Sequence, residues 1–143
     1  MNSIIEGIRE FFLSCPLLDG KTIRVNYLAP KPVEYTIDEV PCEPVVKQYF
    51  DGSSRRQTLF ILASKDAYSR DAVKNMAASQ FFESLSDWME QETALNHLPS
   101  LPAGCTAQSV KAITNGYAFS ADEQNKTQRY QIQCKLIYFK EAF

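Results

Sequence analysis

The side chains that most often do chemistry are few in this chain and lie far apart in the sequence. The single histidine, His97, is the only imidazole that could activate one of the four cysteines as a nucleophile. It lies among Asn96, Leu98 and Pro99, and no neighbouring feature marks any cysteine as activated. The sequence therefore predicts no catalytic residue and no enzyme.

The cysteines also lack the spacing of a metal site. Zinc sites usually combine closely spaced Cys or His ligands, whereas Cys15, Cys42, Cys105 and Cys134 are scattered and form no Cys-x-x-Cys pair. Cys134 lies on an alternating apolar face and is interpreted as a small core residue, and the other three are predicted to be free thiols. The five glycines occur singly, so no phosphate-binding loop is present. We expect no metal and no cofactor.

The charged residues give no sign of acid–base chemistry or of a nucleic-acid surface. The acid pairs Asp38–Glu39 and Asp122–Glu123 are adjacent and would point to opposite faces of a strand, so we interpret them as solvated or turn charges. The formal charge of -2 and the pI near 5.4 argue against specific nucleic-acid binding. Arg55–Arg56 is the only adjacent basic pair, and it is either a pair of solvated loop residues or a local patch.

The length of 143 residues suits one domain spanning 1–143. No segment approaches the roughly 18 uninterrupted apolar residues of a membrane span. Glu6, Arg9 and Glu10 interrupt the apolar residues near the amino terminus, which is not the pattern of a signal peptide. We expect a soluble protein that is made in a cytoplasm and has no membrane partner.

A first helix is predicted from Ile4 to Cys15, because Ser3 and Glu6 have the spacing of a capping box and Pro16 ends the apolar periodicity. Its core-facing residues are Ile8, Phe11 and Phe12. Alternating or continuous apolar runs then predict four strands, at 22–29, 33–40, 45–50 and 57–64. A polar loop at 51–56, opened by Asp51-Gly52, is expected between the last two.

A second, longer helix is predicted to begin at a Ser69 or Asp71 cap and to end near Asn96. Two long strands, 106–119 and 127–139, should follow, joined by a polar loop at 120–126. This order predicts an α+β fold with an antiparallel or mixed sheet and helices packed on one face. The expected core joins the first helix to the second-helix residues Val73, Ala77, Phe81, Leu85 and Trp88, against the strand residues Ile23, Val25, Tyr27, Ile132, Cys134 and Leu136.

Aromatic residues are more numerous than this core requires, with seven tyrosines and nine phenylalanines. Aromatic side chains are enriched at the centres of protein–protein interfaces, although they can equally cover both faces of a sheet. Together with the polar loops they give a set of candidate assembly-interface residues: Tyr49, Asp51, Arg55, Arg56, Tyr68, Tyr117, Phe119 and Phe139.

Three parts of the chain resemble a known family. One runs from Pro44 through Tyr49-Phe50-Asp51-Gly52 to 60–64 and 67–69, and another joins 114–117 to 129–138. The helix between them, with Asn75, Phe81-Phe82, Leu85 and Trp88, also fits. Together they resemble the small minor capsid or tail-terminator proteins of long-tailed phages and prophages of low-GC Gram-positive bacteria. The similarity spans about Ile4 to Phe139, and its motifs are compositional rather than catalytic.

This resemblance implies a tail-terminator-like domain that assembles into a ring, with six copies as the expected number. In that family the ring stops polymerisation of the tail tube and offers a surface to the head–tail connector, so the resemblance implies a place in the virion at the head–tail junction. Two other functions stay open. One is a neighbouring connector component, such as a tail-completion or head-closure protein, and the other is a small enzyme or ligand-binding domain.

Overall fold

The computed structural model describes residues 3–19, 21–26, 34–67, 72–122 and 127–142. In this part of the chain, two α-helices accompany a seven-stranded mixed sheet, which confirms the predicted α+β class. The elements are α1 (Ile4–Leu13), a 3₁₀ turn η1 (Pro16–Leu18), β1 (Ile23–Val25), β2 (Glu34–Val40), β3 (Val45–Gln48), β4 (Ser54–Ala67), α2 (Ala72–Ala94), β5 (Cys105–Ala112), β6 (Tyr117–Asp122) and β7 (Thr127–Lys140).

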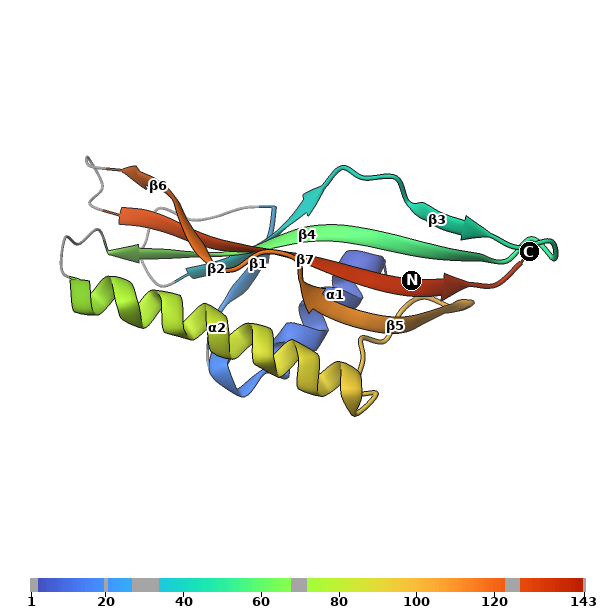
Figure 1. Ribbon diagram of the computed structural model, residues 1–143, viewed down its shortest axis with the longest axis horizontal. Helices are drawn as coiled ribbons and strands as arrows, with labels where there is room; N and C mark the ends of the chain where they lie inside the picture. Colours follow the sequence, from blue (N-terminus) through green and yellow to red (C-terminus); the bar gives the residue numbers. More distant parts are fainter. Residues whose placement is uncertain (1–2, 20, 27–33, 68–71, 123–126, 143) are drawn as a thin grey trace.

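Two long antiparallel strands form the centre of the sheet. β4 and β7 pair along their whole length, from Ser54 opposite Lys140 to Ala67 opposite Thr127. β2 and β3 follow one another along the outer edge of β4, and β5 and β6 do the same along the outer edge of β7. β1 extends the sheet by pairing in parallel with β2. Both helices lie on one side of the sheet, as predicted (Figure 1).

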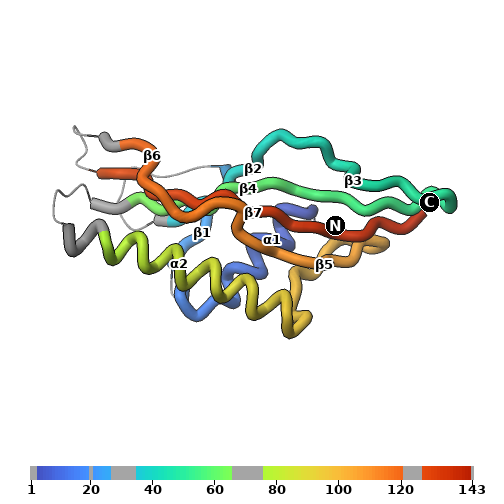
Figure 2. The backbone as a smooth tube through the Cα atoms, viewed as in Figure 1, coloured from blue at the N-terminus to red at the C-terminus, as the bar shows by residue number. Residues whose placement is uncertain are grey.

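One end of the sheet extends beyond the helices (Figures 1 and 2). We call this part the arm, and it consists of β3 with the neighbouring residues 54–57, 105–107 and 137–140. Each of the outer strands β3, β5 and β6 has a register shift, which lies between Val45 and Lys47 in β3. A shift of this kind increases the local twist and interrupts the regular ladder of hydrogen bonds.

The first helix matches its prediction. The Ser3 side chain accepts a hydrogen bond from the Glu6 backbone N–H, which satisfies one of the free donors of the first turn. Ile8, Phe11 and Phe12 are buried, and the Phe12 ring lies 5.8 Å from that of Phe60 on β4. The apolar stripe of α1 is therefore held against the centre of the sheet.

The second helix buries a different stripe from the predicted one. Phe82, Leu85 and Met89 are fully buried, whereas Ala77 is exposed, so its predicted core position is wrong. The Phe82 ring stacks on Tyr130 of β7 at 6.0 Å, and this contact sets the rotation of the helix. Val73 lies among residues whose side chains fall outside the described part of the structure.

Phe81 and Trp88 flank the buried stripe and are partly exposed. Phe81 lies 5.8 Å from the Tyr35 ring, and Trp88 lies 4.7 Å from Phe11 of α1. These two residues therefore connect α2 to β2 and to the first helix at the margins of the core. Both were predicted to be core residues, and both pack against it.

The strand contribution to the core follows the alternation in the sequence. Ile132, Cys134 and Leu136 of β7 are fully buried, as is Ile23 of β1, which confirms these assignments. Val25 is half-buried, and Tyr27 lies outside the described residues.

The predicted strand 106–119 is wrong, because the chain forms β5 and β6 with a break at 113–116. At the break the Thr114 hydroxyl accepts the hydrogen bond from the Gln133 backbone N–H, in place of a ladder carbonyl. Gly116 passes so close to α2 that a Cβ on it would lie 2.4 Å from the Cβ of Phe82. The predicted loop 120–126 is also shorter than expected, since β6 continues to Asp122, and residues 123–126 lie outside the described part.

We expect Phe82→Ala to lower the free energy of unfolding by about 3–5 kcal/mol, because it removes a fully buried ring and leaves a cavity. Ala77→Ser on the exposed side of the same helix should change it by no more than about 0.5 kcal/mol. Chemical denaturation followed by circular dichroism measures both. Equal stabilities for the two variants would show that the helix is rotated differently.

Candidate assembly surface

The face of the sheet that points away from the helices has a polar centre. Successive residues of a strand point to opposite faces, so Phe60 and Leu62 face the helices while Ala63 faces away. We call this second surface the open face. Ala63 pairs with Thr36 of β2 on one side and with Gln131 of β7 on the other, and all three are buried.

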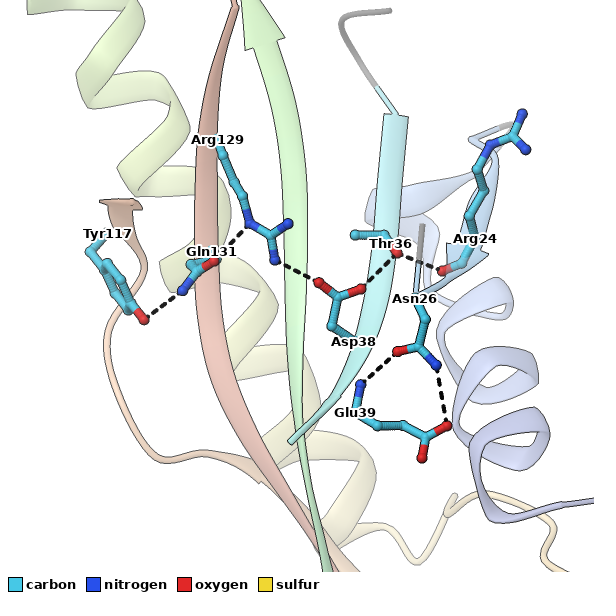
Figure 3. Close-up of polar contacts among 8 residues, drawn as sticks. All are labelled: Arg24, Asn26, Thr36, Asp38, Glu39, Tyr117, Arg129 and Gln131. Carbon is cyan, nitrogen blue, oxygen red and sulfur yellow. Dashed lines mark hydrogen bonds and ion pairs between the residues drawn. The ribbon is translucent and has the colours of Figure 1, made fainter. Parts of the chain in front are cut away.

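An ion pair spans the open face across β4 (Figure 3). The Nη2 of Arg129 on β7 donates to Oδ2 of Asp38 on β2 at 2.7 Å, although 91 residues separate the two in sequence. Each side chain is less than one-third exposed. The small side chain of Ala63 leaves room for the pair, because a larger residue at this position would project into the same space.

Hydrogen bonds extend this pair to β6. Arg129 Nε donates to Gln131 Oε1 at 2.8 Å, and Gln131 Nε2 donates to the Tyr117 hydroxyl at 2.8 Å (Figure 3). Gln133 donates to the same hydroxyl at 3.0 Å. The guanidinium of Arg129 also lies 5.8 Å from the centre of the exposed Phe119 ring. Two of the predicted interface aromatics, Tyr117 and Phe119, are thus positioned by this network.

On the other side, the network reaches β1. The Thr36 hydroxyl lies 3.1 Å from both the Arg24 carbonyl oxygen and Asp38 Oδ1, and its single proton can be donated to one of them at a time. Asn26, whose φ is +55°, accepts a hydrogen bond from the Glu39 backbone N–H at 3.0 Å. The outer strands are therefore connected to β7 by side chains as well as by the backbone ladder.

A second group of predicted residues gathers at the tip of the arm. The rings of Tyr49 and Phe139 lie 6.3 Å apart, and the Lys47 ammonium lies 5.5 Å from the centre of the Tyr49 ring. Phe50 is fully exposed. A shallow depression here is lined by Tyr49, Phe50, Asp51, Ser53 and Phe139.

The turn at the tip is fixed by Asp51. Its Oδ1 accepts hydrogen bonds from the Ser53 hydroxyl and from the Ser53 backbone N–H, the latter at 2.9 Å. Gly52 has a φ of +91°, a conformation that side-chain-bearing residues rarely adopt. The two Ser53 hydrogen bonds favour the ionised carboxylate, so they lower the pKa of Asp51 below its ordinary value.

The predicted loop 51–56 is wrong in extent, because β4 begins at Ser54. Arg55 and Arg56 are consecutive strand residues and point to opposite faces. Arg55 pairs with Phe139 on the open face, whereas Arg56 pairs with Tyr138 on the other face and donates from Nε to the Ser54 hydroxyl at 2.9 Å. The two arginines therefore do not form one patch.

The eight predicted interface residues fall into separate places. Tyr49, Asp51, Arg55 and Phe139 lie together on the arm, while Tyr117 and Phe119 lie at the β6 end of the open face. About 25 Å of β7 separates the two groups, since Phe139 and Gln131 are eight residues apart on one strand. Arg56 faces the helix side, and Tyr68 lies outside the described residues.

Sequence reasoning missed Asp38, Arg129 and Thr36. Their only signal was the presence of polar residues at alternate positions of otherwise apolar strands, which is ordinary for an exposed face. Which of them pair depends on the register of three strands.

Two of the four cysteines are buried, and the histidine is exposed. Burial raises the pKa of both the Cys15 and the Cys134 thiols, which disfavours the reactive thiolate. His97 Nδ1 lies 3.2 Å from Glu92 Oε2, and that histidine borders an open depression with Glu10 and Ser14 rather than a cysteine. In this described part, no group of three or more His, Cys, Asp or Glu residues could hold a metal ion. No helix in the same part has the length and apolar character needed to cross a membrane.

Neither a scan against models of protein families nor a search of curated proteins finds a match to this chain. Its function is therefore inferred from the surfaces described above and from the resemblance noted in the sequence.

We expect Arg129→Met to lower the free energy of unfolding by about 1–3 kcal/mol, because Asp38 and Gln131 lose a charged hydrogen-bond donor. Lys135→Met is the matched control. Lys135 lies on the same face of β7, between Leu59 and Lys111, and removing this like charge should leave stability unchanged or raise it. If both substitutions destabilise equally, the Asp38–Arg129 pair does not hold the open face together.

The Asp51 turn predicts a pH effect with a definite sign. The pKa of Asp51 is lowered in the folded chain. The ionised Asp51 carboxylate therefore stabilises the fold above the ordinary pKa of aspartate, and this stabilisation is lost as pH falls through the lowered pKa. Ser53→Ala should raise the pKa of Asp51 part of the way to its ordinary value, since the backbone hydrogen bond remains. NMR titration of the carboxyl carbon measures this, and Ser54→Ala should leave the pKa of Asp51 unchanged.

Proposed function

We propose that this chain is a structural subunit of a tailed bacteriophage that caps the tail tube, stops its polymerisation and offers a surface to the head–tail connector. The observation that carries the proposal is the arm, which extends past both helices and ends in exposed aromatic residues. Exposed aromatic groups of this kind mark protein-binding surfaces.

The arm is well suited to contact a partner that has a fixed shape. Its strands are continuous with β4 and β7 of the core, so the tip residues are held by the same backbone ladder that passes over α1 and α2. The turn at 49–53 is closed by backbone hydrogen bonds between Tyr49 and both Gly52 and Ser53. A preorganised surface of this kind binds with a smaller entropic cost than a flexible loop.

The shape of the described depressions also favours a binding role over a small-molecule site. Ligand pockets enclose most of their ligand, whereas the depressions at the arm tip and beside His97 are open and shallow. The polar groups of the open face are hydrogen-bonded to one another rather than aimed at an empty space. The resemblance to tail-terminator proteins gives this binding role its specific partners.

The test is to add the purified protein to its cognate tail-tube protein during polymerisation. We expect elongation to halt and electron microscopy to show extra density at one end of each tube. Phe50→Ser should weaken capping by roughly tenfold or more, because it removes a fully exposed aromatic group from the arm tip.

Leu13→Ser is the matched control, since Leu13 is an exposed apolar residue on α1, away from the arm. It should cap as the unaltered chain does. Tubes that keep growing, with no density at their ends, would contradict the proposal, and recovery of the protein on the connector alone would assign it to a neighbouring head–tail component.

A further inference from the structure

The open face contains repulsive contacts that the fold does not require. Three of its cross-strand pairs join residues of like charge, and like charges directly opposite one another destabilise a sheet. The pairs are Lys47 with Arg55, Lys65 with Arg129, and Lys111 with Lys135. Arg129 is offset by Asp38, but the other two pairs have no acidic residue beside them on β3, β4, β5 or β7 among the described side chains.

Near the Lys47–Arg55 and Lys111–Lys135 pairs the open face has apolar side chains beside polar ones such as Gln57. Leu59, Ile61 and Ile137 point to this side of the sheet and are half-buried. Lys135 lies opposite Leu59, which is four positions from Arg55 on β4. About 13 Å therefore separates the Lys111–Lys135 pair from the Lys47–Arg55 pair. The aliphatic side chains next to these cations give bases no ring to stack on, so this part of the open face fits an anionic protein surface better than single-stranded nucleic acid.

The outer surface of α2 has the complementary character. Glu83, Asp87 and Glu90 are exposed and recur at helical spacing over about 10 Å. No Lys or Arg occurs anywhere between Lys74 and Lys111. Met76 and Leu95, near the two ends of the helix, are exposed apolar residues.

A hollow beside this acidic stripe is able to receive a cationic side chain. Glu83 and Asp87 line it together with Ser86, Asn115 and Gly116, and its volume is about 260 Å³. Carboxylates and amide or backbone oxygens are the acceptors that a lysine ammonium group requires.

We infer that the open face of one copy of this chain binds the outer surface of α2 on the next copy. The Lys111–Lys135 and Lys47–Arg55 pairs face Glu83, Asp87 and Glu90 in this contact, and the like-charge repulsion within the sheet is relieved by the partner's carboxylates. The two surfaces lie on opposite sides of the molecule (Figure 1). Each copy therefore binds two neighbours, and the contact is heterologous, of the kind that closes into rings.

The closure of this assembly into a ring rests on the proposed function, but the contact itself does not. Because the contact depends on exposed charges, it weakens as salt shortens the Debye length from about 10 Å at 0.1 M to about 3 Å at 1 M. Self-association should therefore fall steeply with ionic strength.

The test uses two charge-reversed variants of the full chain. One has Glu83→Lys with Asp87→Lys, and the other has Lys111→Glu with Lys135→Glu. Sedimentation velocity should show self-association of the unaltered chain at low salt and a loss of roughly tenfold or more in each variant, because like charges then face each other. Mixing the two variants should restore assembly, since every contact in an alternating assembly again joins opposite charges.

Glu10→Lys with Asp19→Lys is the control, because it changes the net charge as much as the α2 variant does but at exposed positions on α1 and just after η1, outside both surfaces. It should associate as the unaltered chain does. The inference is overturned if the unaltered chain stays monomeric at about 1 mM, a concentration that detects even weak contacts. It is also overturned if mixing the two variants fails to restore assembly.

Two further outcomes distinguish a contact between copies from nucleic-acid binding and from tube capping. If the Lys111→Glu, Lys135→Glu variant loses binding to a single-stranded oligonucleotide but self-associates normally, the open face is a nucleic-acid surface and the inference is wrong. Assembly with the expected charge dependence, together with uncapped tubes, would contradict the proposed function and leave the inference standing. If both charge-reversed variants still cap tubes, this result would support the proposed function and contradict the inference.

Discussion

The continuous pairing of β4 with β7 is the constraint on which the other elements depend. Fourteen residues of each strand are matched, so a single register decides which side chains face α1 and α2 and which face away. A shift of β7 by one residue against β4 would move Ile132, Cys134 and Leu136 out of the core and place Gln131 in it. The burial of Phe12, Phe82 and Leu85 against this one face selects the register, and the polar network on the other face is a consequence of the same selection.

Local signals in the sequence were sufficient where one element decides its own structure. The Ser3 cap and the alternation of Ile132, Cys134 and Leu136 depend on neighbours in the chain, and both were predicted correctly. The rotation of α2 was not predicted, because Phe81 and Phe82 are adjacent. Contacts with residues distant in the sequence, among them Tyr130 and Gly116, decide which of the two is buried more deeply. The break between β5 and β6 was missed because Ile113 and Tyr117 continue the expected spacing, whereas Thr114 and Gly116 respond to β7 and α2.

The candidate surface shows a similar division. Aromatic composition singled out Tyr49 and Phe139 as candidates, and the structure brings their rings together on the arm. It failed for Asp38 and Arg129, which are 91 residues apart and meet only because β2 and β7 are both next to β4. It also placed Arg55 and Arg56 together, although strand geometry separates them. The net charge of -2 does not show that basic residues gather on the open face and acidic residues on α2, because a sum over the chain contains no information about where each charge lies.

The register shifts in the outer strands have a further consequence for how the protein behaves at high concentration. Unpaired strand edges are templates on which other chains can add by backbone hydrogen bonding, and this is a common route to aggregation. β3, β5 and β6 each have an irregular edge, and β3 also has the Lys47 charge on it. Such edges obstruct regular strand addition, so the broad faces rather than the strand edges remain the surfaces for the contact proposed above. In the tail-capping role proposed above, the subunit would wait for a finished tube, and these edges would limit fibre formation in the meantime.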